Sequence, residues 1–267
     1  MRKLVYIGAL ALIAICLYAC NDKKHINDAA VECVDTIEVS TIKVCDSLSY
    51  VAGAEVCNIT TQVEFVYPKF YLSNEKTNEL QGLYTLSVLD IQADSISLAT
   101  AFPMFVEYLM NSYKEVNISF DEDNFEGDYE LIKNCDVDVK ITICYNRGAL
   151  FSVCKKEVAI INGASPQVRH IYSTYNLTEM KRVTFAELVG EENVVSVIEL
   201  LKAKLRNDTN AKNDEELADM GFYNIDNLGG NDNFYLTNDS VVWNYLPREL
   251  SVFEEVRISL SREEIGL

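Results

Sequence analysis

The chain has 267 residues, with 41 acidic and 23 basic side chains and a net charge of −18. Its hydrophobic fraction of 49%, with 11 glycines and 4 prolines, indicates a folded protein and excludes a disordered or low-complexity chain. The acidic excess argues against nucleic acid as a partner, because phosphate groups would be repelled, and favours cations or a basic protein. A charge of this kind also serves simply to keep a protein soluble.

The N-terminus has the features of a secretory signal peptide. Arg2 and Lys3 precede an uncharged apolar run from Leu4 to Tyr18, which is 15 residues long. That length suits the core of a signal peptide and is shorter than the ~20 residues that a transmembrane helix needs. The run leads through one small residue to Cys20, a pattern that resembles a bacterial lipobox, although Tyr18 is bulkier than the residue usual at that position.

We therefore predict that residues 1–19 are a lipoprotein signal peptide, that Cys20 carries the lipid, and that residues 20–50 are a lipidated tether. An acyl chain contributes about 0.8 kcal/mol per buried methylene group, so an acylated Cys20 would hold the protein on a membrane. The alternatives are an ordinary secretory peptide or an uncleaved anchor. Cleavage would remove two basic residues and no acidic ones, which leaves a net charge of −20. The expected location is the cell envelope, with the protein anchored in the outer membrane and facing the periplasm.

Six of the eight cysteines remain once Cys16 leaves with the signal peptide and Cys20 takes the lipid. An even number in an exported protein permits disulfide bonds, while buried free thiols are the equal alternative. No C-x-x-C pair occurs, so we expect neither a zinc ribbon nor a thioredoxin-type site. The pairing stays open for Cys33, Cys45, Cys57, Cys135, Cys144 and Cys154.

Residues 51–161 are predicted to form an N-terminal α+β domain. Residues 56–72 are rich in β-branched and aromatic side chains and predict a strand that ends near Pro68. A polar passage at 73–82 follows, without a predicted element. Residues 101–116 carry apolar side chains at helical spacing and predict a helix with one buried stripe. The stripe consists of Phe102, Phe105, Val106, Leu109 and Met110.

An acidic segment at 120–130 invites comparison with a calcium-binding loop. A loop that begins at Glu122 would place Lys133 where a bidentate glutamate is needed. We therefore expect a solvated loop here, and neither a metal site nor a cofactor in the protein.

A hairpin is predicted next, with its turn at Arg147-Gly148. Residues 135–146 alternate between apolar and polar side chains, residues 150–162 return, and residues 167–177 add a third strand to an antiparallel meander. One face of the first strand carries Val137, Val139, Ile141, Ile143 and Tyr145, and the other carries Asp136, Asp138, Lys140 and Thr142.

Ser165 and His170 raise the question of nucleophilic catalysis. A nucleophile elbow joins a strand to a helix, whereas Ser165 lies between two predicted strands. Pro166 also lacks the backbone N–H that an oxyanion hole would use after the nucleophile. We therefore assign Ser165 to a turn and His170 to a strand, and we expect no catalytic residue.

Residues 162–267 are predicted to form a C-terminal α+β domain, and their motifs resemble those of an exported bacterial family. The corner Gly163-Ala164-Ser165-Pro166 is similar to the G-A-H-P corner of that family, with serine in place of histidine. A strand, a short 183–189 segment and a helix at 194–207 follow in the family's order. Two serine or threonine to glutamate pairs fit capping boxes. These pairs are Thr184 with Glu187 and Ser261 with Glu264.

The last hairpin and the last strand continue the resemblance. The motif at 233–236 and the segment at 245–250 flank a turn at Asn238-Asp239, and a strand at 256–261 follows. The family is the domain of unknown function 3298. The segment at 66–70 is similar, more faintly, to a partner domain, the domain of unknown function 4163. This pair of domains also forms the extracellular region of the lysozyme-sensing anti-sigma factor RsiV, so the resemblance implies extracytoplasmic binding of a basic protein such as lysozyme, or of cell-wall peptidoglycan.

We interpret the protein as an α+β envelope lipoprotein with antiparallel sheets and a few packed helices in two subdomains. We expect a binding module rather than an enzyme, with Tyr235, Trp243 and Tyr245 as candidates for stacking on a ligand. The alternatives are a purely structural envelope component and an envelope glycan hydrolase with a carboxylate pair. The acidic candidates for that pair are Asp121 or Asp123 with Glu126.

Overall fold

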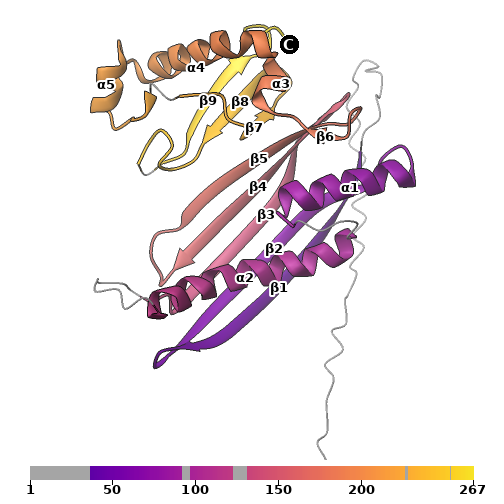
Figure 1. Ribbon diagram of the computed structural model, residues 1–267, viewed down its shortest axis with the longest axis vertical. Helices are drawn as coiled ribbons and strands as arrows, with labels where there is room; N and C mark the ends of the chain where they lie inside the picture. The colour runs from indigo at the N-terminus through magenta and orange to yellow at the C-terminus, as the bar shows by residue number, and fades with distance from the viewer. Residues whose placement is uncertain (1–36, 92–96, 123–130, 226–227, 253) are drawn as a thin grey trace, which may run out of the picture. The chain divides into compact units, whose positions relative to one another are not determined.

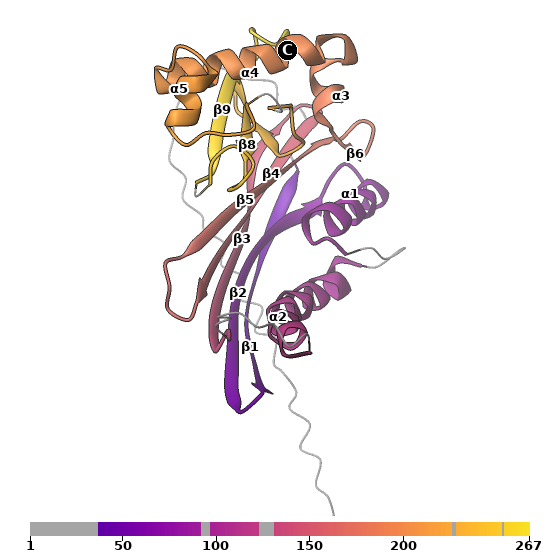
Figure 2. The ribbon, with the colours of Figure 1, turned by 60° about the vertical axis from the view of Figure 1, so that its left-hand side comes forward.

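The structure is a computed structural model that describes residues 37–91, 97–122, 131–225, 228–252 and 254–267, with backbone alone at 118–122. The predicted signal peptide, Cys20 and Cys33 lie outside these residues. The described chain contains two β-sheets and five α-helices (Figures 1 and 2), so the α+β prediction is confirmed. No helix in these ranges is both long and apolar enough to cross a membrane.

The larger sheet has six strands that lie side by side in chain order. Every neighbouring pair is antiparallel except β2 and β3, which run parallel. A parallel pair needs a crossover connection, and two helices between β2 and β3 supply it. The strands are β1 (Glu38–Ala52), β2 (Glu55–Phe70), β3 (Asn134–Arg147), β4 (Leu150–Ile161), β5 (Gln167–Asn176) and β6 (Lys181–Arg182).

Strand β1 corrects the predicted tether, because residues 38–50 belong to the sheet. Four apolar residues of β1 fall at even-numbered positions, so they point toward one face of the sheet, while Val39 and Val51 fall at odd-numbered positions and are exposed. The four pack against the first buried cluster, and the polar residues between them face away. The packed residues are Ile42, Val44, Leu48 and Tyr50.

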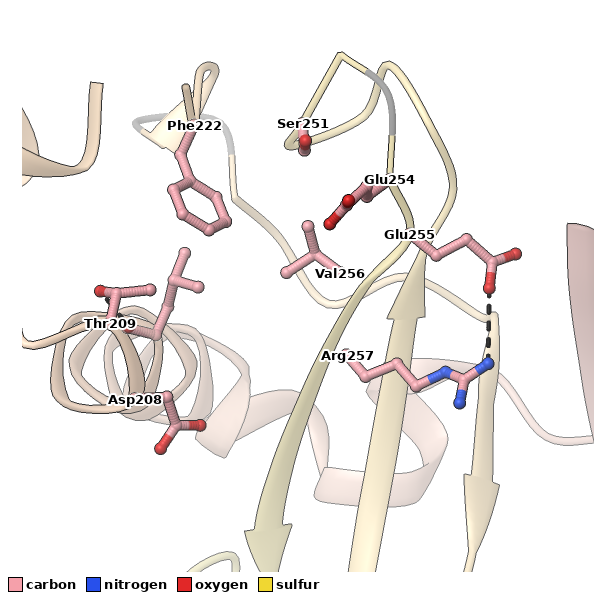
Figure 3. Close-up of a pocket in the computed structure, with 9 residues that line it drawn as sticks. Asp208, Thr209, Phe222, Ser251, Glu254, Glu255, Val256 and Arg257 are labelled. Carbon is pink, nitrogen blue, oxygen red and sulfur yellow. Dashed lines mark hydrogen bonds and ion pairs between the residues drawn. The ribbon is translucent and has the colours of Figure 1, made fainter. Parts of the chain in front are cut away.

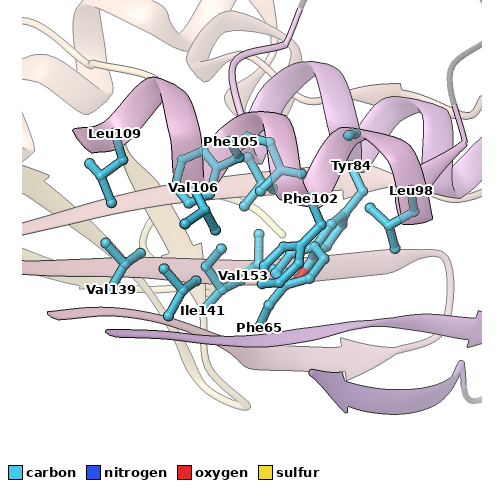
Figure 4. Close-up of a cluster of buried hydrophobic side chains, with 14 of the residues drawn as sticks. Phe65, Tyr84, Leu98, Phe102, Phe105, Val106, Leu109, Val139, Ile141 and Val153 are labelled. Atoms are coloured by element: carbon cyan, nitrogen blue, oxygen red, sulfur yellow. The ribbon is translucent and has the colours of Figure 1, made fainter. Parts of the chain in front are cut away.

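Helices α1 (Asn74–Val88) and α2 (Leu98–Glu122) lie on that same face of the larger sheet (Figures 2 and 4). All five residues of the predicted stripe are buried in the first cluster, so that prediction is confirmed. Helix α1 occupies the passage expected to lack an element. Ser73 caps it by accepting a hydrogen bond from the backbone N–H of Lys76, and Leu80, Tyr84 and Val88 supply a buried row at every fourth position. Helix α2 also runs to Glu122, into the predicted acidic loop.

A β-bulge in β3 corrects the predicted face of one residue. The register pairs Ile143 with Val153 and then Tyr145 with Ser152, so one residue of β3 is extra. The residues before the bulge keep the predicted alternation, while Tyr145 turns to the opposite face and packs against the second buried cluster.

The smaller sheet is antiparallel and has the order β7 (Phe234–Leu236), β8 (Ser240–Tyr245), β9 (Val256–Ser261). The predicted hairpin around Asn238-Asp239 is therefore confirmed. Helix α3 (Phe185–Val189) begins with the predicted Thr184–Glu187 capping box. The 3₁₀ turn Glu191–Asn193 leads into α4 (Val194–Thr209), and α5 (Asp214–Asp219) follows.

The predicted domain boundary between residues 161 and 162 falls inside the larger sheet, because β5 and β6 complete that sheet. The first buried cluster extends to Met180, and the second begins at Val183. Two buried clusters agree with two subdomains, but the chain passes from one to the other about twenty residues later than the sequence suggested.

Candidate functional site

Strands β4 and β5 contact the smaller sheet through polar side chains. The hydroxyls of Ser152 and Thr174, both fully buried, lie 2.8 Å apart. The Thr174 hydroxyl donates to the carbonyl of Phe234 at 3.1 Å, and the Ser152 hydroxyl accepts the backbone N–H of Leu236 at 3.4 Å. The larger sheet therefore binds the backbone of β7 through side chains and leaves these buried polar groups satisfied.

His170 of β5 is held by a carboxylate from the segment before β9. Its Nδ1 lies 2.7 Å from Oε2 of Glu255, and its backbone N–H donates to Oε1 of the same residue at 2.6 Å. Both side chains are mostly buried, with exposed fractions of 19% for His170 and 11% for Glu255. Nη2 of Arg257 donates to Oε2 of Glu255 at 3.4 Å. Together with the two contacts of His170, this gives both carboxylate oxygens of Glu255 a partner.

Two asparagines connect His170 to the smaller sheet. The side-chain amides of Asn233 and Asn244 both donate to the carbonyl of His170, at 3.2 and 3.0 Å. Asn233 Oδ1 accepts the backbone N–H of Tyr172 at 2.6 Å, and Asn244 Oδ1 accepts Nε of Arg257 at 3.2 Å. We call His170, Asn233, Asn244, Glu255 and Arg257 the junction network.

An aromatic pair lies beside the junction network. The rings of Tyr172 and Tyr235 stack with centroids 4.5 Å apart, and the ring of His170 stacks on Tyr172 at 6.3 Å. Burial raises the pKa of Tyr172 above its ordinary value, so its hydroxyl remains protonated at neutral pH.

A pocket of about 230 Å³ opens next to Glu255 and Arg257 (Figure 3). Phe222 and Val256 give it an apolar side, while Asp208, Glu254 and Glu255 contribute three carboxylates against the one guanidinium of Arg257. Asp208 pairs with Lys204 of α4, and Glu255 pairs with Arg257. Glu254 is exposed and makes no hydrogen bond or ion pair with any residue that the structure describes. One carboxylate at this pocket therefore has no partner among the described residues.

The aromatic candidates on the last hairpin are not equivalent. Trp243 is fully buried and packs edge-on against Phe185, with centroids 5.9 Å apart. Tyr245 is 4% exposed, and its hydroxyl donates to the carbonyl of Gly229 at 2.9 Å. The prediction that these two rings stack on a ligand is therefore wrong, because both belong to the core. Tyr235 remains partly exposed, with one ring face covered by Tyr172.

Ser165 lies exposed in the connection between β4 and β5, and His170 lies within β5, as predicted. The partner of His170 is Glu255, 85 residues later in the chain. Sequence reasoning missed this contact, as well as the pocket, because nothing in the spacing of a single sequence links β5 to the segment before β9.

The remaining candidates give no chemical site in the described chain. The side chains of Asp121, Asp123 and Glu126 lie outside it, so the predicted carboxylate pair stays a prediction. Among the residues whose side chains are described, no group of three or more His, Cys, Asp or Glu side chains is placed to hold a metal ion.

Comparison with known proteins identifies the fold. No family model matches the sequence, and no curated protein matches it. A solved member of the domain of unknown function 3298 family from Bacteroides fragilis NCTC 9343 superposes with a TM-score of 0.69 and 15% sequence identity, covering 87% of this chain and 94% of that one. A protein of the same family from Pseudomonas aeruginosa PAO1 gives a TM-score of 0.48 at 10% identity, over 86% of this chain and 93% of that one. The Bacteroides comparison confirms at the level of the fold what the sequence motifs implied: this chain has the fold of a domain of unknown function 3298 protein.

Proposed function

We propose that the protein is a cell-envelope lipoprotein that binds a basic protein outside the cytoplasm, and that the acidic pocket beside the junction network accepts a cationic side chain of that partner. The observation that carries the proposal is the exposed carboxylate of Glu254, which has no partner among the described residues, at a pocket rich in carboxylates. The net charge of −18 supports it at longer range, since it would steer a basic partner toward the protein.

The chemistry of the pocket suits a lysine or an arginine. Both side chains combine a long apolar stem with a charged end. Phe222 and Val256 can contact the stem, and Glu254 can accept hydrogen bonds from the charged end. Arg257 does not oppose such a ligand strongly, because its guanidinium is engaged by Glu255 and Asn244.

A basic protein is favoured over cell-wall glycan as the ligand. Sugar binding by stacking needs exposed aromatic rings, and two of the three candidate rings are buried. A binding module is likewise favoured over an enzyme, because the exposed Ser165 makes no hydrogen bond to His170, whose ring is instead held by Glu255.

The envelope location is proposed from the apolar run and Cys20, in agreement with the lipobox pattern. Mass spectrometry of the mature N-terminal peptide tests it: we expect Cys20 to be the first residue and to carry acyl chains, whereas an unmodified Cys20 would remove the membrane anchor from the proposal.

Binding can be tested with lysozyme as the basic partner and cytochrome c as a basic control, between 0.1 and 1 M salt. The Debye length falls from about 10 Å to about 3 Å over this range, so attraction by charge alone disappears. We expect lysozyme to retain measurable affinity at high salt and cytochrome c to lose it. If lysozyme and cytochrome c both lost binding at high salt, the result would show only a nonspecific acidic surface and would contradict the proposal.

Two variants separate the pocket from the overall charge. Glu254→Gln and Glu115→Gln each remove one exposed negative charge, the first at the pocket and the second on α2. We expect Glu254→Gln to weaken lysozyme binding about 5-fold, as for loss of a single ion pair, and Glu115→Gln to leave it nearly unchanged. Equal effects would place the interaction elsewhere on the surface.

A further inference from the structure

Two cysteines come together on adjacent strands of the larger sheet. Cys154 of β4 lies opposite Thr142 of β3, and the extra residue of the bulge in β3 is Cys144. In a bulge, two residues of one strand oppose a single residue of its neighbour, so Cys144 and Tyr145 both face Ser152. Cys154 is the next residue along β4 on the same face as Ser152. Cys144 follows Thr142, the partner of Cys154, by two positions, so Cys144 and Cys154 lie on the same face of the hairpin as diagonal neighbours.

The two thiols interact directly. The thiol of Cys144 forms a hydrogen bond with the sulfur of Cys154, and this contact holds the pKa of Cys154 below its ordinary value despite its burial. The hydroxyl of Tyr172 and the charge of Arg257 act in the same direction. The same contact raises the pKa of Cys144, so of the two sulfurs it is Cys154 that carries the negative charge when the pair loses one proton.

The other described cysteines do not share this arrangement. Cys45 is exposed on β1 and lies opposite Gln62. Cys57 and Cys135 are buried, and Cys135 lies beside Ile59 in the parallel register of β2 and β3. These three thiols provide internal controls for any chemistry at the pair.

We infer that Cys144 and Cys154 form a thiol–disulfide site that a low-molecular-weight disulfide oxidises across the β3–β4 hairpin. Cys144 is partly exposed and Cys154 is 6% exposed, so the oxidant reaches Cys144 first. The Cys154 thiolate takes the proton of Cys144 as the Cys144 sulfur attacks one sulfur of the oxidant. The oxidant's S–S bond breaks, and the thiolate that leaves accepts this proton from Cys154. The Cys154 thiolate then attacks the Cys144 sulfur and displaces the second thiol. The two protein thiols lose two electrons to the oxidant, and their protons end on the two released thiols.

This inference does not depend on the proposed binding function. It bears on stability, because the bond would join β3 and β4 next to Tyr172, which lies opposite Cys154 on β5 and stacks on Tyr235. A disulfide that closes the short loop between Cys144 and Cys154 would raise the midpoint of thermal unfolding by about 5 °C.

The test uses the reduced protein and oxidised glutathione, followed by trypsin digestion under non-reducing conditions. Trypsin cuts after Arg147, between the two cysteines, so a disulfide joins two separate peptides. We expect a linked Cys144–Cys154 peptide whose mass is lower by two hydrogen atoms than the sum of its parts, and a higher melting temperature that dithiothreitol reverses.

Variants report the order of the two steps. Cys154→Ser should trap glutathione on Cys144, because the displacing thiolate is missing. Cys144→Ser should leave Cys154 without glutathione, because it is buried. Cys45→Ser should leave the linked peptide unchanged. Glutathione on the exposed Cys45 of the unmutated protein shows that the oxidant is effective, and if the linked peptide is then absent, the proposed site is overturned.

Discussion

Strands β4 and β5 are held on their two faces by different kinds of contact. On the face covered by α1 and α2, the rings of Phe151, Tyr175 and Tyr84 pack together, with centroids 6.1 to 6.4 Å apart. On the opposite face, Ser152 and Thr174 bind the backbone of β7 through hydrogen bonds. Neighbouring residues along one strand are therefore held by different physical effects, apolar packing on one face and hydrogen bonds on the other.

The difference teaches which contacts are specific. Apolar packing is non-directional and depends on the surface removed from water. A complete buried hydrogen bond contributes modestly to the free energy of unfolding. A buried polar group that loses its partner, in contrast, destabilises the folded state by the full cost of its desolvation. The helix-covered face should therefore determine most of the stability, and the polar face should determine how the smaller sheet is aligned with β5.

The largest effect should come from the helix-covered face. Phe151→Ala removes a fully buried ring from β4, and we expect the free energy of unfolding to fall by about 3–5 kcal/mol. Urea denaturation of both proteins measures the difference. The matched control is Phe70→Ala, at the end of β2, where the ring is 42% exposed and the loss should stay below about 1 kcal/mol. A small loss for Phe151→Ala would mean that the aromatic cluster is not a principal source of stability.

The polar face should give a smaller but more local effect. Asn244→Ala removes one donor to the carbonyl of His170 and leaves Nε of Arg257 without its acceptor. We expect a loss of about 1–3 kcal/mol, because the Asn244 side chain is fully buried and its removal leaves the hydrogen bonds of the junction network incomplete. Hydrogen exchange provides the second measurement: faster exchange should be confined to β5, β8 and β9. A uniform increase across the larger sheet would contradict the separation of the two faces.

The apolar face could be predicted from the sequence because buried side chains recur at the spacing of a helix or a strand. The stripe on α2 and the alternation in β3 follow from helix and strand geometry, and all five stripe residues are buried. Helix α1 was missed because its buried residues are few and are separated by polar ones, so tertiary packing and the Ser73 cap decide its conformation. Strand β1 was missed because it contains polar residues on its solvent-facing side.

The polar face was not accessible in the same way. Asn233, Asn244 and Glu255 show no period, and their partners are 61 to 85 residues away. The bulge at Cys144 interrupts the alternation by a single residue and moves Tyr145 to the opposite face. The asparagine and glutamate contacts depend on how the two sheets meet, and the bulge depends on the register of β3 against β4. The local pattern of a single sequence encodes neither.

The smallest effect should come from the surface contact that the sequence did predict, the capping box of α3. Glu187 pairs with Lys181 at 2.7 Å and accepts the backbone N–H of Thr184 at 3.0 Å. These contacts, with Lys181 the largest influence, lower the pKa of Glu187 from 4.5 to about 2. Because the Glu187 side chain lies at the surface, Glu187→Gln should lower the urea midpoint only slightly, and by less than either variant above.

The pH dependence separates the charge of Glu187 from its role as a cap. A pKa that is lower in the folded state stabilises the protein above the unfolded value of 4.5, and this contribution is lost as the pH falls toward about 2. Glutamine still accepts the Thr184 N–H but carries no charge. The difference between the two proteins should therefore be complete at pH 6, narrow between pH 5 and pH 3, and be smaller in high salt. A stability difference between the two proteins that stayed constant over this pH range would assign the contribution of Glu187 to hydrogen bonding alone. This surface contact would then resemble the hydrogen-bonded polar face of β5 rather than an ion pair.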